Sequence, residues 1–146
     1  WQIIQKLGAW FRGQVILGLI IGILLFIGYT VIGVPYALLL ALLAGLMEFI
    51  PYVGPFLSAI PALFLAFSVS PLHLLLTVGL IVVVQQLENH LIVPKVMQKT
   101  LGLNPIVSVV AFLVGAKLFG IIGALFAIPV ATACHVAYVE WRSYRR

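Results

Sequence analysis

The chain has 146 residues, of which 64% are hydrophobic and 8% are charged, and its formal net charge is +5. A soluble domain is about half apolar and about a quarter charged. So few charges cannot cover the surface of a soluble domain, which would aggregate in water. The composition therefore excludes an ordinary soluble protein and indicates a membrane protein.

The charged residues are confined to a few short segments. Asp, Glu, Lys and Arg do not occur in residues 13–47, 49–87 and 118–139. Basic residues lie close to both ends of the chain, as they do in cytoplasmic segments that face anionic lipid. We therefore expect the basic residues to interact with the lipid bilayer and not with a nucleic acid.

The N-terminal region is predicted to contain an interfacial helix followed by a membrane span. Apolar residues recur at helical spacing within residues 1–14, with polar residues between them, which is typical of an amphipathic helix at a membrane surface. Val15–Val34 is an apolar run of 20 residues, and a helix of that length spans about 30 Å. Because the chain begins with Trp1 and not with Met, we expect it to be a piece of a longer protein.

The next helix is predicted within residues 35–50. Ala41 and Gly45 lie four residues apart in it, and Gly18 and Gly22 form the same kind of pair in the preceding span. Small residues at this spacing let two helices approach closely in a membrane. We therefore predict that both pairs are helix-packing faces.

Proline and glycine interrupt the apolar segments. Proline lacks a backbone N–H and its ring clashes with the preceding turn, so it breaks or kinks a helix. The sequence PYVGP (51–55), with two prolines and a glycine, follows the second helix. Another proline lies in the next apolar segment, and a further one begins a polar stretch. The predicted structural breaks are Pro51, Gly54, Pro55, Pro61 and Pro94.

Two further helices are predicted beyond these breaks. Ser70 and Pro71 have the residue types of an N-cap and a first helical turn. Pro105 restarts the last helical region, which a glycine-rich bend interrupts at Gly115, Gly120 and Gly123.

The fold class predicted from these elements is all-α, a polytopic transmembrane helical bundle with short, Pro/Gly-interrupted helices. The predicted regions are an interfacial helix over residues 1–14, a transmembrane domain over residues 15–141 and a basic cytoplasmic tail over residues 142–146. Five or six apolar segments are expected in the transmembrane domain, and some of them are short enough to be re-entrant hairpins.

Two glutamates in apolar surroundings are the main candidates for a functional site. Glu48 and Glu88 each follow an apolar segment and each precede a proline. A carboxylate at the centre of a bilayer costs about 2.5–3.5 kcal/mol on insertion scales, so it marks a functional position. Interrupted helices in corresponding positions point to a transporter site. We hypothesise that the two glutamates meet there; the alternative is that both lie in interfacial turns and face water.

Polar residues next to Glu88 extend this candidate site. Gln85 is three residues before Glu88 and four before Asn89, and Gln86 is three before Asn89 and four before His90. Residues at these spacings share a helix face. The strip could bind a polar solute or an ion, relay protons, or hold helices together.

The sequence shows no signature of an enzyme or of a bound cofactor. It contains no four-ligand spacing for a structural metal, no phosphate loop and no nucleophile–base motif. We therefore predict a protein that is not an enzyme and that binds no metal and no cofactor.

Three stretches resemble one family of bacterial transporters. These are FRGQ (11–14), GVPYALLLALLAGLMEFIPYVGP (33–55) and QLENHLIVPKVMQKTLGLNPIVSVVAFLVGAKLFGIIGALFAIPVA (86–131). In this order they are similar to the C-terminal part of the autoinducer-2 exporter family, also described as PerM-like permeases. The resemblance implies a multi-pass transporter of the bacterial inner membrane.

The resemblance also implies two possible transport activities. Members of the family are associated with export of the quorum-sensing signal autoinducer-2 or with sodium–proton antiport. Many relatives carry Asn where this chain has Glu48, and the additional carboxylate favours ion coupling. The alternatives are a membrane scaffold or assembly protein without transport activity, and a passive channel formed by a homo-oligomer.

Overall fold

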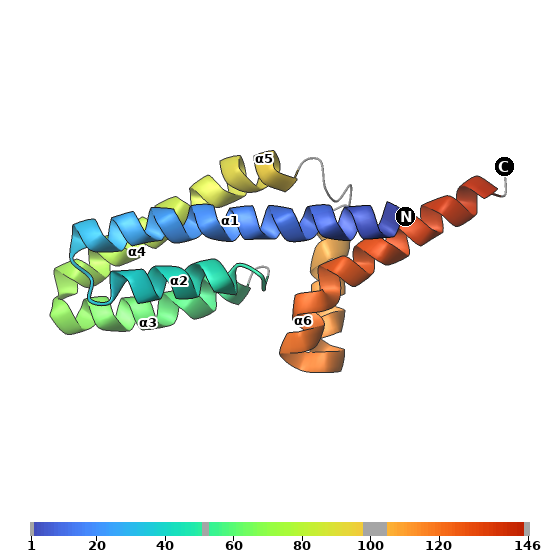
Figure 1. Cartoon of the computed structure of the whole chain (residues 1–146). Coiled ribbons are helices and arrows are strands. Elements are labelled where there is room, and N and C mark those ends of the chain that lie inside the picture. The colour runs from blue at the N-terminus through green and yellow to red at the C-terminus, as the bar shows by residue number, and fades with distance from the viewer. Residues whose placement is uncertain (1, 51–52, 98–104, 145–146) are drawn as a thin grey trace. The chain divides into compact units, whose positions relative to one another are not determined.

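The computed structural model describes residues 2–50, 53–97 and 105–144, and its only regular elements there are helices. The predicted all-α fold class is confirmed for these residues. The chain divides into two compact units, residues 14–96 and residues 1–13 with 97–146, and each is described by itself. Figure 1 shows the helices in chain order.

The first helix, α1, runs from Gln2 to Ile32 without interruption. The predicted interfacial segment and the predicted span therefore belong to one helix, of which Gly8–Ile32 is long and apolar enough to cross a membrane. The helix is followed by Gly33, whose φ of 88° is accessible to glycine. The N–H groups of Gly33 and Val34 both donate to the carbonyl of Tyr29, at 3.0 and 2.9 Å.

The second helix, α2, is short and runs from Ala37 to Met47. It begins after a turn in which Tyr36 has a left-handed φ of 57°. Its 11 residues extend about 16 Å, which is roughly half the hydrocarbon thickness of a bilayer. The helix therefore cannot cross a membrane by itself.

Small residues bring α2 against α1, as the sequence predicted. A Cβ atom built on Gly18 would lie 2.5 Å from the carbonyl oxygen of Gly45, and one built on Gly45 would lie 2.7 Å from that of Gly18. One turn away, a Cβ atom on Gly22 would lie 3.3 Å from the carbonyl oxygen of Ala41. The two backbones are therefore in contact, and only glycine fits at the closest point.

The third helix, α3, runs from Val53 to Val69. The chain breaks between α2 and α3 as predicted, but Gly54 and Pro55 lie in the first turn of α3, where a proline needs no N–H partner. Helix α3 continues through Pro61, so this proline does not end the helix, and the kink expected there stays a prediction. Pro51 lies outside the described residues.

The fourth helical region is a continuous rod made of α4 (Pro71–Leu87), the π-helical segment η1 (Glu88–Ile92) and α5 (Val93–Met97). Its start is confirmed, because the Ser70 side chain accepts a hydrogen bond from the N–H of His73, with Pro71 in the first turn. The predicted break at Pro94 is wrong. The N–H of Val93 bonds to the carbonyl of Glu88, and this wider π turn absorbs the proline without ending the helix.

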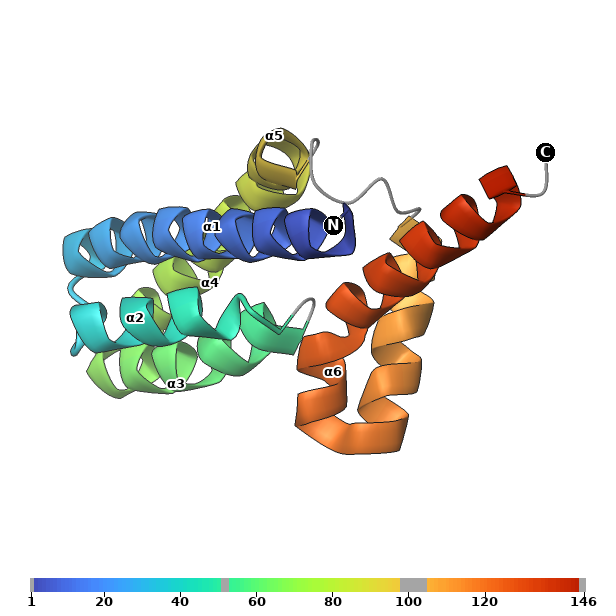
Figure 2. The same ribbon diagram turned by 45° about the vertical axis from the view of Figure 1, so that its right-hand side comes forward.

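Within residues 14–96 the helices form a layered bundle. Helix α3 packs against both α2 and α4, and α2 and α3 run side by side in opposite directions in both ribbon views (Figures 1 and 2). Small residues fill the interface, and the buried members include Ala41, Ala44, Ala62 and Ala66.

Large apolar side chains cover the outer surface of this bundle. Phe64, Leu75 and Leu39 are 71%, 68% and 65% exposed, and many others resemble them. Pro71–Val96 is the second segment long and apolar enough to span a membrane, and only 17% of its most apolar stretch is buried. A helix from the core of a soluble protein would be mostly buried, so these surfaces fit lipid.

The last helix, α6 (Pro105–Tyr144), consists of two limbs joined at a kink. Gly120 has φ 62° and ψ −140°, which confirms the predicted glycine-rich bend. The backbones of Gly115 and Gly123 contact each other across it, since a Cβ atom on either would clash with the carbonyl of the other. The predicted basic tail begins within α6, and residues 145–146 lie outside the described residues.

Candidate functional site

A small cavity lies inside the bundle of residues 14–96, where α1, α2, α3 and the α4–η1 rod converge. Both polar and apolar side chains line it. Its lining residues are Ile21, Leu25, Tyr29, Ala44, Glu48, Pro55, Ser58, Ala59, Ile81, Val84, Gln85 and Glu88. The centre of a water-sized sphere can occupy about 20 Å³ of this cavity, which is room for one water molecule or an occupant of similar size.

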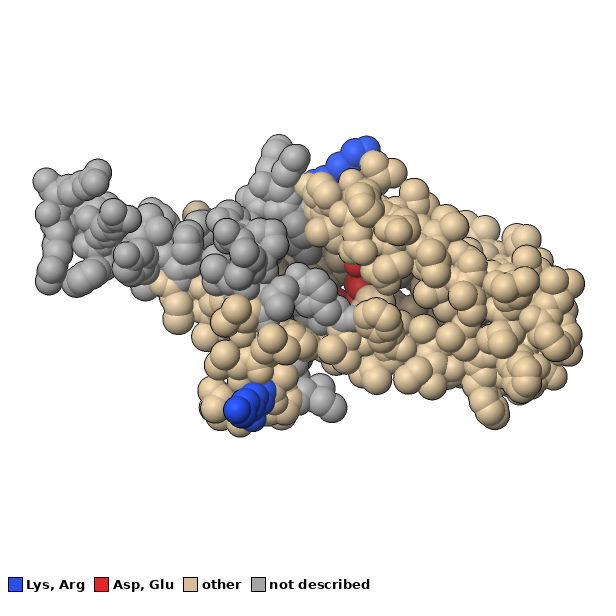
Figure 3. Space-filling view, turned by 180° about the vertical axis from the view of Figure 1, so that it is seen from behind, with Lys and Arg blue, Asp and Glu red and all other residues tan. Residues whose placement is uncertain are grey.

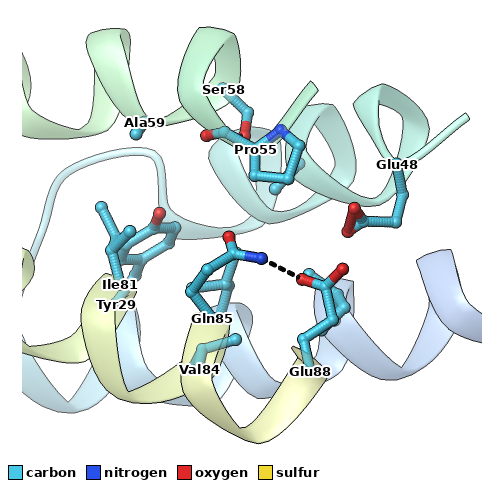
Figure 4. A pocket seen from close by; sticks show the side chains of 12 residues that line it. Tyr29, Glu48, Pro55, Ser58, Ala59, Ile81, Val84, Gln85 and Glu88 are labelled. Atoms are coloured by element: carbon cyan, nitrogen blue, oxygen red, sulfur yellow. Dashed lines mark hydrogen bonds between the residues drawn. The ribbon is translucent and has the colours of Figure 1, made fainter. Parts of the chain in front are cut away.

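The structure brings Glu48 and Glu88 to this one cavity. Glu48 is 3% exposed and Glu88 is 6% exposed, so both are buried. Their carboxylates approach from opposite walls and point toward each other (Figure 4). The convergence of the two glutamates that the sequence suggested is therefore observed, and neither of them lies in a water-facing turn.

Glu48 reaches the cavity from the end of α2. It is the C-cap residue of that helix, and its N–H donates to the carbonyl of Ala44 at 3.1 Å. Because α2 is short, it ends inside the bundle, beside Gly18 of α1, and does not reach the N-terminal end of α1. The carboxylate is consequently placed among apolar helices.

Glu88 reaches the cavity from the point where α4 becomes η1. The Nε2 group of Gln85 donates a hydrogen bond of 2.8 Å to Oε2 of Glu88. Because Nε2 of Gln85 is used in this way, its Oε1 atom remains available as an acceptor. The spacing of three residues predicted from the sequence thus produces a direct side-chain contact.

The other polar residues of the predicted strip face away from the cavity. Gln86, Asn89 and His90 are exposed, and the His90 ring contacts the backbone carbonyl of Gln86 at 3.0 Å. A helix turns by about 100° per residue, so neighbours of an inward-facing residue point outward. The strip is therefore divided between the cavity and the outer surface.

Two hydroxyl-bearing residues of the cavity were missed in the sequence. Tyr29 from α1 and Ser58 from α3 both line it, and Figure 4 shows the Tyr29 ring beside Gln85. Ser58 Oγ donates to the carbonyl of Pro55 at 3.1 Å. A lone tyrosine inside the apolar run Val15–Val34 was the available signal for the first of them.

Two further buried polar residues lie outside the lining of the cavity. Gln14 of α1 is 4% exposed and donates to the main-chain carbonyl of Glu48. Thr77 of α4 is fully buried, and its hydroxyl has no hydrogen-bond partner. The bundle therefore holds more polar groups than an apolar packing core requires.

The cavity holds two acidic side chains without a basic counterpart. Two of its lining residues are acidic, and none of them is Lys, Arg or His. In the space-filling view from behind, the acidic atoms are recessed in a hollow, and the described residues that border them are neither acidic nor basic (Figure 3). Two buried carboxylates need a compensating positive charge, which a proton or a bound cation can provide.

The described residues contain no cluster suited to a tightly bound transition metal. No group of three or more His, Cys, Asp or Glu residues comes together among them. The oxygen atoms of the cavity instead have the chemistry that hard cations and protons require.

Sequence comparison finds similarity to one family and to proteins named as putative transport proteins. The family model described as AI-2E family transporter matches residues 2–143. "Putative transport protein YueF" of Bacillus subtilis is 42% identical over 127 residues, which cover 86% of this chain and 34% of that protein. "Putative transport protein YrrI" of the same species is 34% identical over 141 residues, covering 97% of this chain and 40% of that protein.

A protein of another species is also similar to this chain. A "Putative transport protein" of Thermotoga maritima is 36% identical over 118 residues, covering 80% of this chain and 36% of that protein. The chain thus spans between about a third and two fifths of the length of these relatives. No solved structure shows a significant match to the chain.

Proposed function

Because this chain belongs to the AI-2E transporter family, we propose that it forms the ion-coupling part of a secondary transporter. In this proposal Glu48 and Glu88 together hold one positive charge, either a proton or Na⁺, and exchange it during transport. The family and the apolar helices make the chain part of a membrane protein. We also propose that the chain is part of a multi-pass protein of the bacterial inner membrane.

The observation that carries the proposal is the meeting of two buried glutamates from separate helices. Burying a carboxylate in an apolar helix bundle costs free energy. Both glutamates are buried at one cavity that no basic side chain lines. A pair held together for structure alone would be stabilised by an Arg or Lys partner. In a site that must bind and release a positive charge, a permanent Lys or Arg partner would take the place of that charge.

The size of the cavity favours an ion over an organic solute. About 20 Å³ for the centre of a water-sized sphere accommodates one water or one small ion, whereas pockets for organic ligands measure about 300–1,000 Å³. Oxygen atoms of Glu48, Glu88 and Gln85 are available as cation ligands. Export of an autoinducer-2-like solute would need a path that this cavity does not supply.

The α2–α3 hairpin supports a position within the membrane. If Gly8–Ile32 of α1 crosses the bilayer, α2 starts near the end of that span and returns by only about 16 Å. The contact between Gly18 and Gly45 puts the end of α2 beside the inner part of the span. The hairpin therefore turns back inside the bilayer, as the interrupted helices of transporters do.

The proposal is tested by ion flux into proteoliposomes that contain the full-length parent protein. We expect flux driven by a Na⁺ or proton gradient, and we expect Glu48→Gln and Glu88→Gln each to abolish it, since the amide keeps the shape and removes the charge. Lys95→Gln, which removes an exposed charge from the same rod, serves as the control and should keep the flux.

Different outcomes would separate the competing functions. Undiminished gradient-driven flux in both glutamine variants would show that these carboxylates do not couple ions. Unitary currents in single-channel recordings would instead indicate a passive channel. A full-length protein that moves no solute or ion under any gradient, and that is recovered with a stoichiometric partner, would indicate an assembly protein.

A further inference from the structure

A buried amide on α1 holds the end of α2 at the position of Glu48. Gln14 is 4% exposed, and its Nε2 group donates to the main-chain carbonyl of Glu48, 34 residues later in the chain. Only the amide nitrogen of a glutamine can donate to a carbonyl oxygen, so the orientation of the group follows from the contact. The bond joins two helices that are otherwise connected by apolar packing.

The end of α2 needs such a partner. The last carbonyl groups of a helix have no partner within it, and Glu48, at this end, is buried. The chain then reverses through tight turns, in which the N–H of Phe49 donates to Leu46 at 3.3 Å and that of Ile50 to Met47 at 2.9 Å. Neither bond uses the Glu48 carbonyl.

Two other contacts fix the same turn from either side. A Cβ atom on Gly54 of α3 would clash with the carbonyl of Met47, so α3 lies directly against the end of α2. A Cβ atom on Gly18 of α1 would lie 3.8 Å from Cβ of Glu48. The Glu48 residue is therefore enclosed between α1 and α3, and a small shift of its backbone would redirect its carboxylate.

We propose that Gln14 is a positioning residue of the carboxylate pair, which holds the Glu48 backbone so that its side chain faces Glu88. This inference rests on the proposed function of the pair. Gln14 does not line the cavity and does not bind the transported charge. It acts through Glu48, and its effect should therefore appear in the properties of that carboxylate.

The test uses Gln14→Met, which keeps the length of the side chain and removes the donor. In proteoliposomes of the full-length parent protein we expect gradient-driven flux to fall by about tenfold, because a misplacement of about 1 Å in a positioned site can cost up to about 10²-fold. We also expect the pH of half-maximal flux to move by about half a unit, or about threefold in proton concentration. A purely structural role would lower the amount of active protein without moving the pH profile.

A second readout reports on Glu48 without transport. A hydrophobic carbodiimide reacts with carboxyl groups in apolar surroundings, and mass spectrometry measures its adducts on the Glu48 and Glu88 peptides separately. We expect Gln14→Met to change labelling of Glu48 by severalfold and to change labelling of Glu88 less. Thr30→Val is the matched control, since it removes a hydroxyl that donates to the Phe26 carbonyl at 2.7 Å on the exposed side of α1.

The outcomes distinguish this inference from the proposed function. If Glu48→Gln abolishes flux while Gln14→Met leaves both the pH profile and Glu48 labelling unchanged, the positioning role is wrong and the proposed function stands. If the parent protein moves no ions, Glu48 labelling alone decides the role of Gln14. Should Gln14→Met fail to fold, Gln14→Asn provides the same test, because its amide is one methylene too short to reach the carbonyl.

Discussion

Glu48 and Glu88 reach the same cavity from two differently built regions. Glu48 caps a helix of 11 residues, and contacts from α1 and α3 hold it in place. Glu88 lies inside a continuous helical rod, and its closest polar partner, Gln85, is on the same rod. One carboxylate is thus placed by tertiary packing, and the other by local helix geometry.

This difference predicts separate sensitivities for the two halves of the site. Substitutions at the contact between α1 and α2 should disturb Glu48 first. Substitutions along the α4–η1 rod should disturb Glu88 first. If the two carboxylates act as one unit, either disturbance should reduce transport, although carbodiimide labelling will show which carboxylate has moved.

The largest effect is expected from Gly18→Val at the contact between α1 and α2. The new Cβ atom would lie 2.5 Å from a backbone oxygen of Gly45, so the two helices must separate. Overpacking typically costs about 1–3 kcal/mol and occasionally more, and the upper end is expected here because the obstructing atom belongs to the backbone. Thermal unfolding in detergent should show the loss of stability, and Glu48 labelling should change more than Glu88 labelling.

The control for this substitution is Gly79→Ala on α4. A Cβ atom there meets nothing within 4 Å, so we expect no loss of stability and unchanged labelling. Equal loss of stability in Gly79→Ala and Gly18→Val would contradict the account of the glycine contact.

An intermediate effect is expected from Gln85→Met, which removes the 2.8 Å hydrogen bond to Glu88. Hydrogen bonds to charged groups contribute about 1.5–3 kcal/mol, so we expect flux to fall by about tenfold or more. Gln86→Met makes the same chemical change at the adjacent, exposed position and should keep the flux. Matching losses in both variants would show that the inward orientation of Gln85 does not matter.

The smallest effect is expected from Ser70→Ala at the start of α4. Ser70 accepts a hydrogen bond from the N–H of His73 at 3.3 Å, and loss of an N-cap costs about 1 kcal/mol. We expect a lower unfolding temperature with unchanged labelling of Glu48 and Glu88. A change in the pH profile of flux would mean that the cavity depends on the whole of α4 and not on the turn that carries Glu88.

The sequence predicted the helices and the two glutamates because these depend on local patterns. Long apolar runs predict helices, and the shared context of Glu48 and Glu88 indicated that they belong together. The contact between Gln85 and Glu88 also follows from helical spacing. The consequence of a proline was harder to predict, because Pro94 lies in a helix that continues through a π turn.

The rest of the site depends on contacts between residues far apart in the sequence. Gln14 binds a main-chain carbonyl 34 residues away, and no side-chain pattern marks such a partner. Tyr29 and Ser58 lie within apolar segments, and they become cavity residues only when the helices of residues 14–96 pack together. Their roles could be assigned only once the helices were placed in space.

The most direct test of the shared cavity is cross-linking between the two positions. Glu48→Cys and Glu88→Cys are combined in a Cys134→Ser background of the full-length parent protein, and iodine is added to oxidise the two thiols to a disulfide. We expect this pair to cross-link within one molecule, whereas Glu48→Cys with Asn89→Cys, whose second position is exposed, should not. Equal or faster cross-linking of the Asn89 pair would contradict the claim that Glu48 and Glu88 face one cavity.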